Sequence, residues 1–201
     1  MKEKIHDQMV AGTRKLLKET IINLMEQKGF ESMTVRDIAS NAHLNRGTFY
    51  LHYRDKYELM ERVQEELLDG LQAVLKEINI VKGMKYVSAE VAYPPLVDVF
   101  RYLKENGRSF TVLLGVKGDP AFQKKMKRIV RHTFHSVFVQ YSSLKDTNVP
   151  MFHEYMPAFA TSALFGLIEE WLERGMPNTP EEMAVMHFKI LNFIRIQASR
   201  L

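Results

Sequence analysis

The spacing of apolar residues is the feature that most restricts how this chain can fold, because it is helical along almost all of the 201 residues. Apolar side chains recur at i, i+3, i+4 and i+7 in successive segments, and no alternating segments joined by a hairpin turn occur. Gly29 ends the first segment, and Pro94 and Pro120 open later ones. Thr179 caps the last segment. The pattern therefore predicts an all-α fold.

The composition excludes several classes of site. The chain has no cysteine, which rules out disulfides, Cys-ligated zinc, iron–sulfur clusters and a thiol nucleophile. No apolar run approaches the ~18 residues of a membrane span, and no signal-peptide pattern follows Met1. We therefore expect a cytoplasmic protein with no membrane contact, no cofactor and no bound metal.

The positive charge is concentrated near the N-terminus. Residues 1–56 hold ten Lys or Arg and seven Asp or Glu, whereas residues 57–201 hold eighteen and seventeen. A modest basic excess is compatible with nucleic-acid binding without establishing it. We expect two domains with a boundary between residues 56 and 57.

Residues 34–56 have the spacing of two short helices joined by a tight turn. Thr34 is followed three residues later by a carboxylate, the capping box that starts a helix. Asn45 is a good N-cap for the second helix, whose inner face would carry Phe49 and Tyr53. The segment is therefore interpreted as a helix-turn-helix.

The outer face of the second helix would carry hydrogen-bond donors suited to a DNA groove. These are Arg46, Thr48, Tyr50 and the neighbouring His52, with Gly47 permitting close approach. Lys56 opens the next helix, whose N-terminus would favour a phosphate. On the pattern alone, a helical hairpin with a solvated polar face is an equally good interpretation.

The same stretch resembles the DNA-binding domain of the tetracycline-repressor (TetR) family of bacterial transcription regulators. The preceding helix and the segments 113–126 and 166–176 resemble the family too, the latter two resembling the regulatory domain of Gram-positive members. The residues that match the family's motif are Thr34, Ile38, Ala39, Ala42, Gly47, Thr48, Tyr50, Lys56 and Leu59.

The resemblance implies a DNA-binding residue set for an N-terminal three-helix domain at 1–56. The implied set is Thr34, Arg36, Asn45, Arg46, Gly47, Thr48, Tyr50, His52 and Lys56. Three positions depart from the family pattern. His43 replaces the turn glycine, and Asn45 replaces a serine cap. Leu51 stands where many members have a polar or aromatic residue, and it is placed to contact a thymine methyl instead.

The last two helical segments are apolar on more than one face, so each must bury more than one face. A homodimer is the usual solution, and a thick monomeric bundle is the alternative. The interface candidates are Phe159, Leu164, Phe165, Ile168, Phe188 and Leu191.

The resemblance further implies that residues 57–201 form a ligand-binding and dimerisation domain. The whole would be a ligand-responsive repressor that binds a pseudo-palindromic DNA operator and responds to a small apolar or amphipathic effector. The pocket candidates are Phe100, Phe110, Phe134, Phe138, Tyr141, Phe152, Met156 and Trp171.

Two other classes of protein remain open from the residues themselves. His132 and His135 are spaced to share a metal in an α-helical metalloenzyme, but catalytic and nucleotide-binding motifs are absent. A helical interaction protein with no DNA role is the third interpretation. We expect no enzyme activity.

Overall fold

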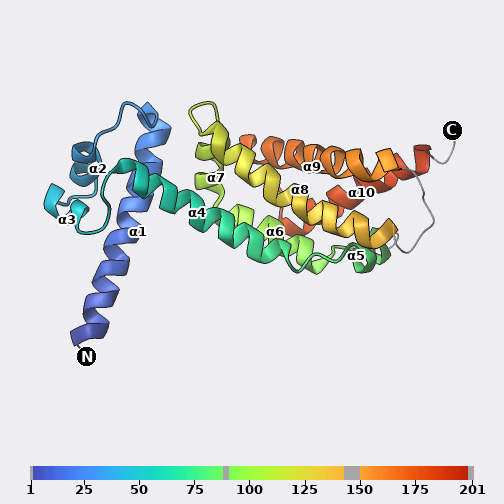
Figure 1. Ribbon diagram of the computed structural model, residues 1–201, viewed down its shortest axis with the longest axis horizontal. Coiled ribbons are helices and arrows are strands. Elements are labelled where there is room, and N and C mark those ends of the chain that lie inside the picture. Colours follow the sequence, from blue (N-terminus) through green and yellow to red (C-terminus); the bar gives the residue numbers. More distant parts are fainter. Residues whose placement is uncertain (1, 88–90, 143–149, 199–201) are drawn as a thin grey trace. The chain divides into compact units, whose positions relative to one another are not determined.

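The computed structural model describes residues 2–87, 91–142 and 150–198, and every regular element within these ranges is a helix (Figure 1). The predicted all-α fold is confirmed. The helices are α1 (Lys2–Lys28), α2 (Val35–Asn41), α3 (Arg46–Tyr50), α4 (Lys56–Leu75), α5 (Ile80–Val87), α6 (Pro94–Glu105), α7 (Gly107–Leu114), α8 (Pro120–Ser142), α9 (Pro150–Glu173) and α10 (Pro180–Ala198).

The predicted start and stop signals lie at the ends of the helices. Gly29 follows α1 in the left-handed region, at φ 78°, where glycine carries no steric penalty. Pro94 and Pro120 are the first residues of α6 and α8. Thr179 exchanges hydrogen bonds with Glu182, at 2.8 and 3.2 Å, and so caps α10.

Helix α7 was not expected from the sequence, because the glycine that opens it looks like a helix terminator. Gly107 instead marks a close approach. A Cβ atom there would lie 2.3 Å from Cε of Met176, so a larger residue would have to displace that side chain. The short helix α5 was not expected either.

The helices divide into two compact units. Unit 1 contains Met1–Leu67 and Val112–Pro120, and unit 2 contains Leu68–Thr111 and Ala121–Leu201. Unit 1 extends beyond the expected boundary at residue 56 because the first turns of α4 bury apolar side chains. Within unit 1, Lys117 joins the segment Val112–Pro120 to α1, since its ammonium donates to the carbonyls of Glu26 and Gln27 at 3.2 and 2.9 Å.

Each unit has its own core. In unit 1, the side chains that are fully or almost fully buried are Leu17, Ile21, Met25, Ile38, Phe49 and Leu59. In unit 2, α10 packs against α5 and α6. The large buried side chains of unit 2 are Phe100, Phe110, Phe122, Phe165 and Trp171.

Candidate nucleic-acid interface

Helix α2 begins with the predicted capping box. The backbone N–H of Thr34 donates to Asp37 Oδ2 at 2.8 Å, and the N–H of Asp37 donates to Thr34 Oγ1 at 3.2 Å. Lys28 forms an ion pair with Asp37 at 2.9 Å. The hydrogen bond with Lys28 and those with Thr34 lower the pKa of Asp37 to about 2. The ion pair joins the last residue of α1 to the first turn of α2.

The turn between α2 and α3 is a Schellman motif built without glycine. The N–H of Leu44 donates to the carbonyl of Ala39 at 2.9 Å, and the N–H of His43 donates to that of Ser40 at 3.1 Å. His43 has φ 54°, in the left-handed region. A histidine therefore occupies the left-handed turn position that glycine usually takes.

Asn45 caps α3, as predicted. Its side-chain oxygen accepts hydrogen bonds from the N–H of Thr48, at 2.7 Å, and from the hydroxyl of Thr48, at 3.1 Å. A Cβ atom at Gly47 would lie 3.1 Å from that same oxygen. The missing side chain at residue 47 therefore leaves the capping oxygen of Asn45 undisturbed.

Helix α3 has one buried and one exposed side. Phe49 has no exposed surface, and Tyr53 is 5% exposed. Tyr50 is 49% exposed, and its hydroxyl accepts a hydrogen bond from Nη2 of Arg46 at 3.2 Å. The guanidinium of Arg46 lies 5.9 Å from the centre of the Tyr50 ring. Arg46 and Tyr50 thus form a donor-bearing pair on the outer face, as the sequence indicated.

Two further candidates lie beside α3. His52 is half-buried. Its pKa is lowered mainly by this burial and to a smaller extent by the positive charge of Arg14. Arg36 on α2 and Leu51 after α3 are exposed. Arg14 belongs to α1 and was not among the predicted residues, because nothing local in the sequence signals that α1 brings a charge close to His52.

Lys56 has partners that its predicted role did not include. Its ammonium donates to the carbonyls of Phe30, Glu31 and Met33 at 3.0, 3.1 and 3.0 Å. It also lies 4.7 Å from the centre of the Phe30 ring and 5.2 Å from that of Tyr57. Three carbonyls match the three N–H donors of a lysine, so Lys56 ties the segment before α2 to the start of α4.

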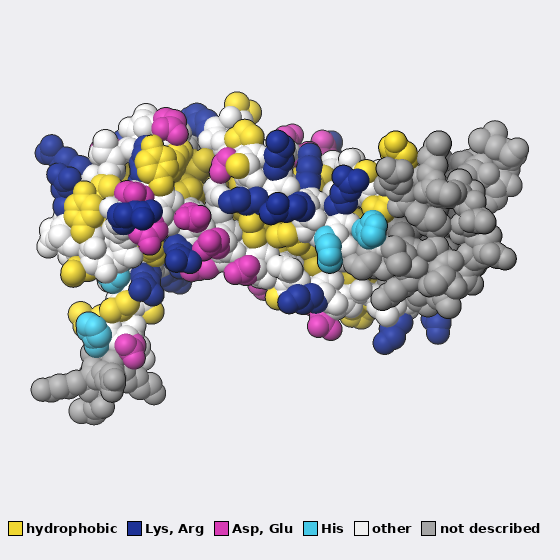
Figure 2. Space-filling model, viewed as in Figure 1, with side chains coloured by type: hydrophobic (Ala, Val, Ile, Leu, Met, Phe, Trp, Pro, Cys, Tyr) yellow, Lys and Arg dark blue, Asp and Glu magenta, His cyan; other side chains and the backbone are white. Residues whose placement is uncertain are grey.

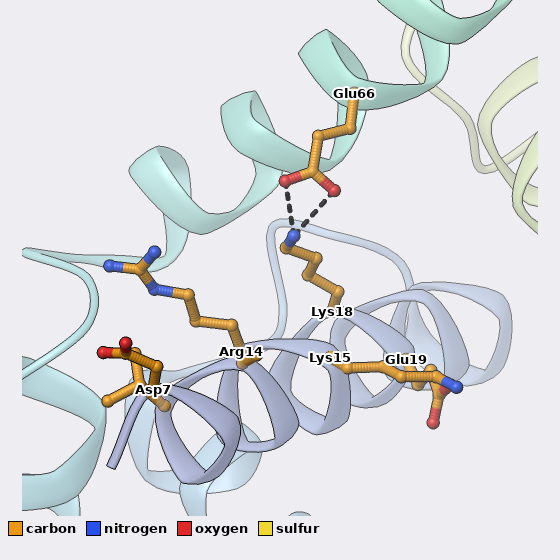
Figure 3. Close-up of a pocket in the computed structure, with 8 residues that line it drawn as sticks. Asp7, Arg14, Lys15, Lys18, Glu19 and Glu66 are labelled. Atoms are coloured by element: carbon orange, nitrogen blue, oxygen red, sulfur yellow. Dashed lines mark hydrogen bonds and ion pairs between the residues drawn. The ribbon is translucent and has the colours of Figure 1, made fainter. Parts of the chain in front are cut away.

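An open cavity of about 500 Å³ lies between α1 and α4 in unit 1. Its lining is Asp7, Val10, Ala11, Arg14, Lys15, Lys18, Glu19 and Glu66. Lys18 crosses it to form an ion pair with Glu66, whose Oε2 lies 2.6 Å from Nζ (Figure 3). None of the predicted pocket residues lines this cavity.

The predicted effector-pocket residues fall into two groups. Phe100, Phe110 and Trp171 are buried in unit 2, and Phe134 is half-buried. Phe100 and Trp171 meet edge to face, with ring centres 5.6 Å apart. Among the side chains that the structure describes, none forms a hydrogen bond with the buried indole Nε1 of Trp171. The side chains of Phe138, Tyr141, Phe152 and Met156 lie outside the described residues.

The predicted interface residues also separate. Phe159 is 53% exposed, whereas Leu164, Phe165 and Ile168 are buried within unit 2 itself. Phe188 is half-buried, with its ring centre 6.1 Å from that of Tyr93, and the side chain of Leu191 lies outside the described residues. Among the described residues of α9 and α10, the large apolar side chains that are exposed are Tyr155, Phe159, Met186 and Ile190.

His132 and His135 are both exposed on α8. Over the described part of the chain, no group of three or more His, Asp or Glu is arranged to hold a metal ion. No helix in that part is long and apolar enough to cross a membrane.

The family comparisons cover most of the chain. Residues 17–63 match the family described as bacterial regulatory proteins, tetR family, and residues 90–193 match the one described as transcriptional regulator C-terminal region. The uncharacterized HTH-type transcriptional regulator YxbF of Bacillus subtilis (strain 168) is 34% identical over 59 residues. That match covers 29% of this chain but only 16% of the length of YxbF.

Solved structures of bacterial regulators share the fold of most of the chain. A TetR transcriptional regulator from Streptococcus agalactiae 2603V has a TM-score of 0.61 and 19% identity, over 94% of this chain and 98% of that one. The transcriptional regulator FadR from Bacillus subtilis, solved in complex with stearoyl-CoA, has a TM-score of 0.58 and 14% identity. It matches over 88% of this chain and 96% of its own. At these identities the likeness shows the fold alone.

Proposed function

The chain belongs to the TetR family of bacterial transcriptional regulators, and from this premise we propose that it is a ligand-responsive repressor that binds a pseudo-palindromic operator as a homodimer. The family consists of DNA-binding regulators and not of enzymes, which removes the metalloenzyme interpretation. The observation that supports the proposal most directly is the two-sided α3, with Phe49 buried and Arg46 and Tyr50 exposed.

In this proposal the outer face of α3 enters the major groove of DNA. Arg46 and Tyr50 donate to base edges or phosphates, and the exposed Leu51 contacts a thymine methyl. Gly47 and Thr48 lie against the sugar–phosphate backbone. The contacts that position the helix on the duplex come from Thr34, Arg36 and His52 at its flanks, and Asn45 holds α3 in shape.

We propose an indirect role for Lys56. Because its three donors already bind carbonyls, a direct phosphate contact would require it to release one of them. Its main effect on DNA binding is then to hold the segment before α2, and with it the orientation of the helix-turn-helix.

We propose that two chains pair through α9 and α10. Phe159 on α9 and Met186 and Ile190 on α10 expose 53%, 48% and 41% of their surface, which is unusual for side chains of this size. On the same side of α9, a Cβ atom added at Gly166 would meet nothing within 4 Å, so a partner helix can approach closely there. Each paired chain would contribute one α3, and the two would match two operator half-sites.

We propose that unit 2 binds the effector next to Trp171 and Phe100. The buried indole N–H of Trp171 has no partner among the described side chains, which is costly, and an acceptor atom on a ligand would remove that cost. The effector weakens DNA binding only as far as it prefers the conformation that does not bind DNA. Since FadR was solved with stearoyl-CoA, acyl-CoA thioesters belong in an effector screen.

The test is footprinting of the full chain on DNA from upstream of its own gene, followed by a screen of metabolites for release. Arg46→Ala should lower operator affinity by about 5- to 150-fold, which corresponds to the ~1–3 kcal/mol of one base contact. The control is Lys76→Ala, which removes one exposed positive charge at the residue that follows α4. Equal affinities of the two variants would refute the proposed role of α3.

A further inference from the structure

Helix α8 carries a concentration of positive charge that the helix-turn-helix does not explain. From Pro120 to His135 the sequence has five Lys or Arg and no Asp or Glu. The five are Lys124, Lys125, Lys127, Arg128 and Arg131. Residues 57–201 hold eighteen cationic and seventeen anionic side chains, so without these five the rest of that region is acidic by four charges. Helix α8 therefore accounts for the net positive charge of residues 57–201.

Most of these cations lie along one side of the helix. At about 100° per residue, Lys124, Arg128, Arg131 and His135 fall within about 60° of one another. We call these four residues the α8 basic stripe, and all four are exposed. Figure 2 shows a row of Lys and Arg side chains over α8 that leads to two histidines. The opposite side of the helix is buried and carries Phe122, Met126 and Val130.

The stripe lacks compensating charges. Some exposed cations elsewhere pair with carboxylates, as Lys15 does with Glu19 and Arg174 with Glu170. Within the described ranges, Lys124, Arg128 and Arg131 form no ion pair with Asp or Glu. Like charges three and four residues apart on a helix repel each other. The arrangement thus opposes helix stability, and this points to an anionic partner outside the chain.

The shape and chemistry of the stripe indicate which anion fits. Small molecules bind in concave, mostly apolar sites, whereas these side chains project from the outer side of a helix. Protein interfaces need buried apolar or aromatic anchors, and none of the large apolar side chains exposed in the described structure lies on α8. A linear polyanion remains. The stripe is about 16 Å long at 1.5 Å per residue, and one DNA strand places a phosphate about every 3.4 Å of axis.

We propose that the α8 basic stripe is a second DNA-binding surface, which contacts the phosphate backbone of a duplex without reading its sequence. This role goes beyond the operator recognition assigned to α3, because the stripe would supply affinity for a duplex of any sequence. Such contacts raise non-specific binding and so the time that a regulator spends on DNA during its search.

The first test measures binding of the full chain to a duplex of about 30 bp without the operator, at NaCl concentrations from about 50 to 300 mM. The variant is Lys124→Gln/Arg128→Gln/Arg131→Gln. The matched control is Lys76→Gln/Lys82→Gln/Lys85→Gln, which removes the same charge from exposed positions of the same unit. The slope of log affinity against log salt should become shallower by about 2–3 in the first variant only, since each lost phosphate contact contributes ~0.9. A slope equal to that of the control overturns the proposal.

The second test locates the duplex. Because the chain has no cysteine, Arg128→Cys gives a single attachment point for an iron chelate that cleaves nearby DNA. Cleavage of the bound duplex from residue 128, and none from a Lys82→Cys control, supports the proposal. No cleavage from residue 128 contradicts it.

Two arms separate this inference from its rivals. The stripe variant should keep the ratio of operator to non-operator affinity, whereas Arg46→Ala should lower that ratio. If Arg46→Ala lowers the ratio of operator to non-operator affinity and the stripe variant leaves the salt slope unchanged, α3 recognises the operator and the stripe does not bind DNA.

A Glu-rich peptide is the other probe. If the stripe variant loses the peptide and keeps its DNA slope, the surface serves an acidic protein and the DNA inference is wrong.

Discussion

Single side chains in unit 1 do more for the fold than their sequence positions suggest, and Lys56 is the clearest case. Lys56→Met leaves three carbonyls without their donor, and unpaired buried polar groups each cost about 1–3 kcal/mol. Since the carbonyls are only partly buried, we expect the free energy of unfolding to fall by about 1–3 kcal/mol in total. Urea denaturation measures it.

Lys76→Met is the control for this prediction, because Lys76 is exposed and should change the unfolding free energy by less than about 0.5 kcal/mol. Equal stability of the two variants would show that the three hydrogen bonds contribute nothing. If Lys56→Met keeps full stability but loses DNA binding, the result would instead favour a direct contact between Lys56 and a DNA phosphate.

Substitution of the turn residue His43 should raise the free energy of unfolding, whereas substitution of Lys56 should lower it. At φ 54° a side chain with a Cβ atom is strained, and glycine is not. His43→Gly should raise the free energy of unfolding by about 0.5–1 kcal/mol, measured by urea denaturation. Asn41→Gly, inside α2, should lower it by a similar amount because glycine weakens a helix. A destabilised His43→Gly variant would mean that the imidazole makes a contact that outweighs the strain.

At the scale of single elements, α10 carries a titratable group in its packed face. Burial lowers the pKa of His187 to about 4, from an ordinary value of 6.5. The unfolded chain therefore binds a proton more readily than the folded one as the pH falls from about 6.5 to 4. This group's contribution to stability is complete above pH 6.5, and at pH 5 about 2 kcal/mol of it is lost.

His187→Met should remove that part of the pH dependence. The measurement is urea denaturation of both proteins at pH 7.5 and 5, in which the wild-type chain should lose about 2 kcal/mol more than the variant. Identical losses would place the histidine in water in the folded state.

The exposed faces of α9 and α10 carry the second prediction at this scale. Phe159→Glu/Met186→Glu places charges in the proposed dimer interface and should weaken pairing by at least about 2 kcal/mol, the cost of losing a hot spot. Sedimentation should then show monomers at concentrations where the wild-type chain is a dimer. Val91→Glu, which changes another exposed apolar side chain of unit 2, is the control and should pair normally.

At the scale of the whole molecule, the two α3 helices of a dimer require half-sites at a fixed separation. Half-sites one helical turn apart are separated by about 34–36 Å. Inserting about 5 bp between them should reduce affinity to that of one half-site, and about 10 bp should restore part of it. Gel-shift measurements on the spaced operators test this. Equal affinity for all spacings would show that each chain binds DNA independently.

The sequence predicted what neighbouring residues determine. The caps at Thr34 and Asn45 and the inner position of Phe49 depend on residues three or four apart, and all three were predicted correctly. The carbonyls around Lys56 and the charge of Arg14 beside His52 come from distant segments, which no local spacing encodes. Helix α9 is apolar on several sides, so its periodicity alone did not show that Leu164 faces the core while Phe159 is exposed.

The side-chain oxygen of Asn45 accepts both hydrogen bonds from Thr48, and an aspartate would accept them equally well. Asn45→Asp would then fold and pair normally while setting an anion against the operator phosphates. In a cell that carries both alleles, such chains would associate with wild-type chains and inactivate them, so the mutation would be genetically dominant.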